Sequence, residues 1–336
     1  MRKTVVMFVF LTLVMFAFRS LPELISWPSY FPKPIYDFRK KPLTTAQIEL
    51  GRTLFYDPIL SLDSSTSCAS CHSPYNSFAH TDHSLSHGIH DSIGTRNAPA
   101  LINLAWNSLL MWDGAVNHIE VQPLAPITNA SEMGEDMSHV VLKLNRLMRY
   151  RKLFYSAYGD SVITGQRTLL ALAQFQLSLI SCNSKYDSVR TGNAAFTAQE
   201  QRGYDLFLRH CNSCHTEPLF TNGLFANNGL SIDTSLNDLG RIRITHDIND
   251  SMKFKVPTLR NAEYTYPYMH DGRFLSLYDV IRHYTSGIQI SGTLAPQLRK
   301  PVVLSAAEKT DLVAFLLTLS DKKFIFEKRF GPPQRN

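Results

Sequence analysis

CASCH at residues 68–72 and CNSCH at residues 211–215 are two copies of one pattern, Cys-x-x-Cys-His. This spacing is typical of a c-type haem attachment site, because two thiols three residues apart can each bond one vinyl group while the next imidazole reaches the iron. Zinc sites and redox dithiols also use Cys-x-x-Cys, but neither explains two copies that both end in histidine. We therefore predict two covalent haems, one held by Cys68, Cys71 and His72 and one by Cys211, Cys214 and His215.

The residues around the two motifs repeat as well. The pattern TAQ-x3-G-x2-LF occurs at residues 45–55 and again at 197–207, shortly before each motif. A capping threonine with Glu or Gln three residues later predicts a helix start in both copies. Apolar residues at helical spacing follow each motif, at 172–179 and 312–319. A helix, a haem motif and a closing helix make a cytochrome c fold. The sequence therefore predicts a mainly α protein with two tandem cytochrome c-like domains related by internal duplication.

This duplication divides the chain into segments. We place the N-terminal cytochrome c domain at about residues 43–190 and the C-terminal one at about residues 195–325. Residues 21–42, rich in proline and aromatic side chains, precede them as a linker, either a tether or an extended arm. Residues 1–20 have a basic start and an apolar run, which suits a secretory signal peptide or an uncleaved N-terminal membrane anchor. Either alternative exports the body to the periplasm, where c-type haem attachment is completed.

Composition and charge favour a globular protein without nucleic-acid partners. Of the 336 residues, 44% are hydrophobic and 18% are charged, which is not the composition of a disordered chain. The formal net charge is +6, but residues 1–20 carry three basic side chains and no acid, so the remainder is only mildly basic. Because no Lys/Arg run stands out, we expect no nucleic-acid binding.

The function depends on what lies opposite each proximal histidine. An iron with one protein ligand can bind peroxide, whereas an iron with two mostly transfers electrons. The loop after the first motif contains four candidate sixth ligands, His80, His83, His87 and His90. A solvated loop is the plain alternative for these histidines. In the second unit the candidate sixth ligands are Met269, His270, His283 and Tyr284.

Glu132 is a candidate acid–base residue. A carboxylate beside an open iron can take the first proton of bound peroxide and return it to the leaving oxygen. Composition alone does not distinguish Glu132 from an ordinary surface acid near a helix start.

Five further stretches are characteristic sequence motifs: residues 96–99 (RNAP), 111–114 (MWDG), 126–133 (PITNASEM), 254–261 (FKVPTLRN) and 265–272 (TYPYMHDG). Together with the two haem motifs, and in this order, they resemble the bacterial di-haem cytochrome c peroxidase family, which includes the MauG-type enzymes of methylamine utilisation. The resemblance covers nearly the whole chain after about residue 43.

The resemblance implies roles in the first unit. His72 would be the proximal ligand of the peroxide-binding haem, and Glu132 matches the family's distal catalytic acid. Gln122 and Pro126 match neighbours of that acid in the distal pocket. Trp112 matches the tryptophan between the two haems, whose indole would carry electrons or a hole between them. Core packing is the alternative role for this indole.

The resemblance also implies a metal ion between the domains. Asn97, Thr265 and Pro267 match the ligands of a calcium ion there. An amide oxygen and two backbone carbonyls suit calcium, a hard cation that would complete its shell with water.

Two positions depart from the peroxidases of this family. Near Thr95 those enzymes have a histidine that closes the first haem at rest, so we expect an open first iron unless His87 or His90 substitutes. Where those enzymes have a methionine ligand, this sequence has Tyr284, as the MauG-type enzymes do. The resemblance therefore implies Tyr284 as sixth ligand of the second haem iron.

Three functions follow as hypotheses. The first is a peroxidase that reduces hydrogen peroxide to water with electrons from a small periplasmic donor, a cytochrome c or a cupredoxin. The second is a MauG-type oxidase that uses high-valent iron to oxidise a partner protein. The third is a di-haem electron carrier without catalysis. The distal match at Glu132 favours the first over the third. The sequence leaves a monomer and a homodimer open.

Overall fold

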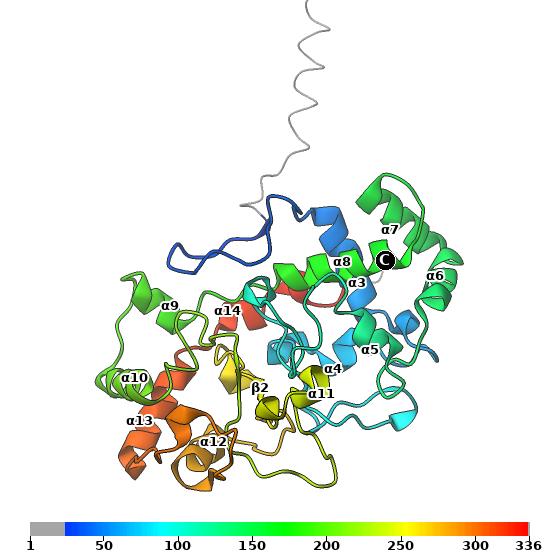
Figure 1. Cartoon of the computed structure of the whole chain (residues 1–336). Helices are drawn as coiled ribbons and strands as arrows, with labels where there is room; N and C mark the ends of the chain where they lie inside the picture. The colour runs from blue at the N-terminus through cyan, green and yellow to red at the C-terminus, as the bar shows by residue number, and fades with distance from the viewer. Residues whose placement is uncertain (1–23, 335–336) are drawn as a thin grey trace, which may run out of the picture.

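The computed structural model describes residues 24–334, so the expected signal or anchor in residues 1–20 lies outside the described residues. The protein is mainly helical, which confirms the predicted fold class (Figure 1). The α-helices are α3 (Thr45–Tyr56), α4 (Cys68–Cys71), α5 (Leu124–Thr128), α6 (Met137–Asn145), α7 (Met148–Tyr158), α8 (Gly165–Ser178), α9 (Lys185–Arg190), α10 (Ala198–His210), α11 (Ile242–Thr245), α12 (Leu277–Arg282), α13 (Ala306–Leu317) and α14 (Lys322–Ile325). No helix within residues 24–334 combines the length and the apolar character that crossing a bilayer requires.

Strands and short helical turns complete the fold. The strands β1 (Phe225–Ala226) and β2 (Phe254–Lys255) pair antiparallel, and α12 continues into one π-helical turn, η7 (His283–Gly287). The 3-10 turns are η1 (Pro58–Leu60), η2 (Pro74–Asn76), η3 (Ile89–Asp91), η4 (Leu104–Trp106), η5 (Ile248–Asp250), η6 (Ala262–Tyr264), η8 (Pro296–Leu298) and η9 (Lys328–Phe330).

Each unit is built on one pair of crossed helices, α3 with α8 and α10 with α13. The repeated glycine explains the crossing. A Cβ on Gly51 would lie 1.9 Å from the carbonyl oxygen of Ala171, and a Cβ on Gly203 would lie 1.9 Å from that of Asp311. Only glycine permits backbones to approach this closely. The same device at the same place in both units supports the internal duplication.

Aromatic rings fill the space beside each crossing. Phe55 of α3 packs on Phe175 of α8 with ring centroids 5.1 Å apart, and Phe207 of α10 packs on Phe315 of α13 at the same distance. All four rings are almost fully buried. The two units therefore have separate but equivalent cores.

The two hydrophobic cores do not follow the expected domain bounds, 43–190 and 195–325, at every residue. Tyr186 of α9 belongs to the core of the second unit. Phe324 of α14 and Phe330 pack in the core of the first unit. Each unit thus receives a short segment from the other side of the boundary.

Residues 24–42, which we name the arm, are bound to the first unit and do not form a free tether. Phe31 and Phe38 of the arm are buried. The indole N–H of Trp106 donates to the carbonyl oxygen of Pro32 over 2.7 Å. The carbonyl of Ala105 accepts two backbone N–H groups of the arm at 2.9 and 3.0 Å.

Two arginine clusters hold the units together. Arg96 donates to Asp113 of the first unit and to Asp238 of the second over 2.5–2.9 Å. Arg260 is fully buried and makes a bidentate pair with Asp187 of α9 at 2.8 and 2.9 Å. A buried charge needs a partner of this kind, because desolvation of a lone charge is very costly.

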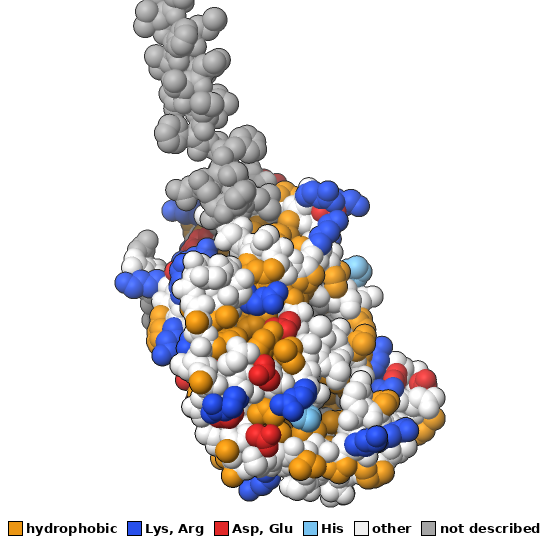
Figure 2. Space-filling view, turned by 90° about the vertical axis from the view of Figure 1, so that its left-hand side faces the viewer, with side chains coloured by type: hydrophobic (Ala, Val, Ile, Leu, Met, Phe, Trp, Pro, Cys, Tyr) orange, Lys and Arg blue, Asp and Glu red, His pale blue; other side chains and the backbone are white. Residues whose placement is uncertain are grey.

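On the surface, basic and acidic side chains are interspersed across the face drawn in Figure 2, with no large patch of one sign.

Candidate haem sites and the cavity between the units

The first Cys-x-x-Cys-His motif forms α4, and His72 is the residue that ends this helix. Nδ1 of His72 lies 2.7 Å from the carbonyl oxygen of Phe78. A carbonyl can only accept, so Nδ1 carries the proton and Nε2 presents its lone pair. Burial lowers the pKa of His72 to about 4, which keeps the ring neutral. A neutral imidazole with a fixed tautomer is what an iron ligand requires.

The second motif repeats this arrangement. Nδ1 of His215 lies 3.3 Å from the carbonyl oxygen of Phe220 and 3.0 Å from that of Pro257. Burial lowers the pKa of His215 as well. The thiols beside these imidazoles are free, and burial raises the pKa of Cys68 and of Cys211 to about 12. Thiols kept neutral and unpaired fit covalent attachment of a haem.

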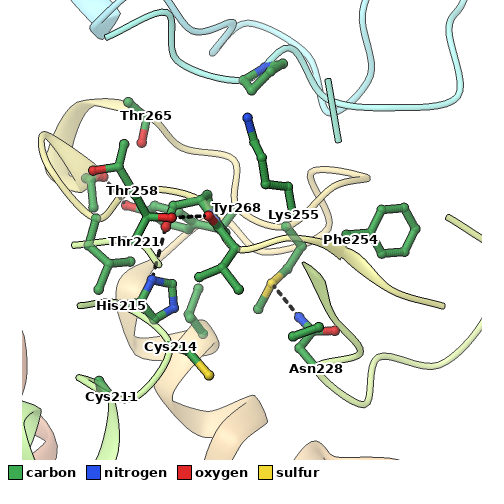
Figure 3. Close-up of a pocket in the computed structure, with 18 of the residues that line it drawn as sticks. Cys211, Cys214, His215, Thr221, Asn228, Phe254, Lys255, Thr258, Thr265 and Tyr268 are labelled. Carbon is green, nitrogen blue, oxygen red and sulfur yellow. Dashed lines mark hydrogen bonds between the residues drawn. The ribbon is translucent and has the colours of Figure 1, made fainter. Parts of the chain in front are cut away.

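A cavity of about 290 Å³ extends from the second motif to the first unit. Cys211, Cys214 and His215 line it on one side, and Trp112 and Ile102 line it on the other. Figure 3 shows His215 and Cys214 together on one side of this cavity. Its lining is mostly apolar and includes the neutral imidazole of His215, which fits the flat apolar body of a haem.

Three of the four candidate sixth ligands in the second unit line this cavity: Met269, His270 and Tyr284. The fourth, His283, does not line it, and its Nε2 lies 2.9 Å from the carbonyl oxygen of Asn228. His283 is therefore a structural residue of the π-turn.

All three side chains have contacts with neighbouring residues. The sulfur of Met269 accepts from the side-chain amide of Asn228 over 3.4 Å, and the ring of His270 stacks on Phe254 with centroids 3.7 Å apart. Tyr284 lies deep in the cavity. Burial raises the pKa of Tyr284 to about 12, a hydrogen bond from Asn228 opposes this shift, and the two thiols of the motif add to it.

Glu132 lies beside the first motif. Its Oε1 accepts from the side-chain amide of Asn129 over 3.0 Å, which fixes the carboxylate. Burial raises the pKa of Glu132, and the hydrogen bond from Asn129 opposes this. The carboxylate in turn helps to raise the pKa of Cys68 and Cys71, so it faces the attachment site.

The other two residues expected in the distal pocket are more loosely placed. The side-chain amide of Gln122 points to the sulfur of Met111 at 3.6 Å. The carbonyl of Pro126 accepts from the backbone N–H of Met133 over 3.2 Å, which ties α5 to the Glu132 turn. Pro126 therefore positions Glu132, and Gln122 shows no hydrogen bond to it among the described residues.

Three of the four loop histidines form a row next to the first motif. Nε2 of His80 lies 3.3 Å from Nδ1 of His83, and the ring of His83 stacks on that of His87 with centroids 4.1 Å apart. The carbonyl of His87 accepts from the thiol of Cys71 over 3.2 Å. His90 is exposed. The row covers the attachment site, and His90 lies outside it.

Trp112 lines the cavity, and its indole N–H donates to the carbonyl oxygen of Asn97 over 2.8 Å. The expected calcium ligands Asn97, Thr265 and Pro267 also belong to the lining of this cavity. The side-chain amide of Asn97 donates to the carbonyl of Ser84 over 3.0 Å, which leaves its oxygen free for a cation.

Sequence reasoning gave no role to Lys255. Its side chain is buried, lines the cavity and points toward the first unit, where Nζ donates to the carbonyl of Leu109 over 3.3 Å (Figure 3). Burial lowers the pKa of Lys255 to about 8. A cation in this place suits a haem propionate. The sequence signal was its position in the FKVPTLRN stretch, which does not reveal where the side chain points.

Comparisons with known proteins find relatives that match most of the chain. The family model for di-haem cytochrome c peroxidase matches residues 45–195. The chain is 36% identical over 304 residues to the methylamine utilization protein MauG of Methylorubrum extorquens, covering 87% of this chain and 82% of that protein. It is 33% identical to the cytochrome c551 peroxidase of Nitrosomonas europaea, covering 86% and 84%. A crystal structure of a MauG-like protein associated with microbial copper homeostasis superposes with a TM-score of 0.84 and 31% identity, covering 92% of this chain and 99% of that one.

Proposed function

This chain belongs to the di-haem cytochrome c peroxidase family, whose members carry two c-type haems, and from that membership we propose that it reduces hydrogen peroxide to water at the first haem with electrons from a small donor protein. The observation that carries this proposal is the half-buried carboxylate of Glu132, fixed by Asn129 beside the first motif. An electron carrier has no use for an acid–base group there.

The residues of the chain account for the proton transfers. The haem, when bound, supplies an iron that holds peroxide and accepts its oxidising equivalents. Glu132 takes the proton from the peroxide oxygen nearest the iron and gives it to the far oxygen, which leaves as water. Asn129 keeps the carboxylate in this orientation. Because burial raises the pKa of Glu132, its carboxylate is a stronger base than an exposed one.

The remaining roles are part of the same proposal. Trp112 would carry electrons between the two sites, and Tyr284 would be a ligand of the second haem iron. Asn97, Thr265 and Pro267 hold a calcium ion that fixes the units around Trp112. Bacterial members of this family are typically periplasmic, and we propose that this chain also works there after export.

Glu132→Gln tests the proposal. We expect the variant to react with peroxide roughly 10²–10⁴-fold more slowly than wild type, with both haems attached and their spectra unchanged. Glu120→Gln is the control, because Glu120 is an acid of the same segment that pairs with Lys41, away from the site. Wild-type rates in Glu132→Gln would overturn the assignment.

Tyr284 supports a second candidate function, oxidation of a side chain on a partner protein. Phenolate stabilises oxidised iron, whereas a thioether favours the reduced state. The burial of Tyr284 in the cavity with both thiols of the second motif fits this alternative. The Tyr284→Met variant separates the two functions.

A further inference from the structure

The three tryptophans of the chain connect the cavity to the protein surface. Trp112 and Trp106 both line the cavity that contains His215. The ring of Trp106, which is 8% exposed, meets the ring of Trp27 edge to face, with centroids 5.6 Å apart and planes at 89°. Trp27 belongs to the arm and is partly exposed. Two indoles in contact therefore run from the cavity wall to solvent.

We propose that Trp106 and Trp27 form a path by which electrons enter the cavity from an acidic one-electron donor protein bound at the arm. The proposal rests on the peroxidase function above and adds the place and the chemistry of the donor. Indole is among the side chains most easily oxidised by one electron. Electron transfer slows steeply with distance, so two rings in contact outperform a gap filled by aliphatic side chains.

The arm fixes the geometry of this path. The indole N–H of Trp106 is held by the carbonyl of Pro32 at 2.7 Å, and the neighbouring carbonyl of Ala105 holds two further backbone groups of the arm. Phe31 and Phe38 pack against Trp106 and Trp27, with centroids 5.5 and 5.7 Å apart respectively. Packing is the ordinary role of such rings. Unlike the phenylalanines, the two indoles are easily oxidised by one electron, and their contact reaches from the cavity wall to the surface.

Charge identifies the kind of donor. The arm carries four basic side chains, of which Arg39 pairs with Asp37 of the arm and Lys41 pairs with Glu120. Lys33 and Lys40 form no ion pair within residues 24–334, and both are exposed. A basic surface steers an acidic partner and speeds its association. A small acidic redox protein therefore fits this surface better than a basic one.

The electrons delivered along this path balance the peroxidase reaction. For each peroxide, two electrons leave the donor one at a time, pass from Trp27 to Trp106 and into the cavity of the second site, and would reach the first site, where peroxide is reduced, by way of Trp112. With two protons from solvent they convert hydrogen peroxide into two waters. Each indole loses one electron and regains one in every passage, so both are unchanged after turnover.

The first test uses the full-length holoprotein with peroxide and two small donors, ferrocyanide as an anion and hexaammineruthenium(II) as a cation. We expect Trp27→Phe to oxidise ferrocyanide several-fold more slowly, while Phe38→Leu, which alters packing on the same indole, stays near wild type. The double variant Lys33→Gln, Lys40→Gln should oxidise ferrocyanide up to about tenfold more slowly at low salt. It should oxidise hexaammineruthenium(II) at the wild-type rate.

The second test does not depend on turnover. Without a donor, peroxide should oxidise Trp27 itself, and mass spectrometry should find oxygen added at this residue. Trp106→Phe should reduce this product several-fold, with haem spectra unchanged. An unmodified Trp27 together with wild-type ferrocyanide rates in Trp27→Phe would overturn the path and leave the peroxidase function intact. A wild-type protein that consumes no peroxide with either donor would overturn both.

Discussion

Nδ1 of His215 lies 3.0 Å from the carbonyl oxygen of Pro257, a residue 42 positions further along the chain. The matching imidazole of the first unit, His72, lies 2.7 Å from the carbonyl oxygen of Phe78 and has a second backbone partner in Pro99. Each proximal ring is thus oriented by a carbonyl of its own loop and by a proline of the cavity lining. The two sites share both the motif and the way in which the fold supports it.

Variants of the two imidazoles test which haem meets peroxide. We expect His72→Ala to abolish the spectral change that peroxide causes, because the first site loses its iron ligand. His215→Ala should keep peroxide binding at the first site and lose its reduction by external donors. Stopped-flow spectra of both variants, with haem content checked by mass, measure this. The reverse pattern would move the peroxide site to the second unit.

The pH dependence of the peroxide reaction should report Glu132. Its carboxylate acts first as a base, so the rate should fall as the pH drops through its pKa. Because burial raises that pKa, the fall should begin at a higher pH than the ordinary glutamate value of about 4.3. Rates of the first peroxide step across pH measure this. The same fall in Glu132→Gln would assign the titration to another group.

Tyr284→Met should raise the reduction potential of the second haem, because a thioether ligand favours reduced iron relative to a phenolate. Peroxidase turnover with a small donor should then persist or increase. In the absence of a donor, the lifetime of the state formed by peroxide oxidation should shorten. Potentiometry and the decay of the peroxide-treated spectrum check these outcomes. Phe274→Leu, which alters a ring packed on His283 next to Tyr284, is a packing control. An unchanged potential would remove Tyr284 from the ligand set.

Local signals in the sequence predicted what a local pattern can encode. The repeated TAQ-x3-G-x2-LF pattern predicted the starts of α3 and α10, and the haem motifs marked both imidazoles. Contacts set by the tertiary fold left no such signal. Neither the direction of the Lys255 side chain nor the seating of Trp106 against the arm follows from spacing, because each depends on segments far apart in the chain. The row of loop histidines also needed the fold, since stacking is not a periodic property of the sequence.

The buried pair of Arg260 and Asp187 should dominate stability at the unit boundary. Asp187→Asn leaves the guanidinium buried without its counterion, which costs about 3–5 kcal/mol. Asp160→Asn, at an exposed pair with Arg167, should cost far less. Urea denaturation of the holoprotein measures both. Equal losses would mean that water reaches Arg260.

The same pair sets a pH dependence of stability. Burial alone would raise the pKa of Asp187, but Arg260 outweighs burial and the pKa is lowered. A lowered pKa means that the carboxylate adds stability above its unfolded value of about 3.9 and that this contribution is lost as the pH falls further. The difference between wild type and Asp187→Asn should therefore shrink on acidification below about pH 4. A constant difference would assign the loss to packing.

Gly203→Ala tests the helix crossing on which the second unit is built. Alanine stabilises a helix by up to about 1 kcal/mol relative to glycine, so helix propensity alone predicts that the variant is more stable. The new Cβ would lie 1.9 Å from the carbonyl oxygen of Asp311, and backbone cannot yield as a side chain can. We therefore expect a net loss of about 1–3 kcal/mol, as for other overpacked cores, and a shift of the second haem spectrum with the first unchanged. Gly292→Ala, where no atom lies within 4 Å of the added Cβ, should be neutral. A stabilised Gly203→Ala would show that α10 and α13 separate freely, and the crossing would then not position His215.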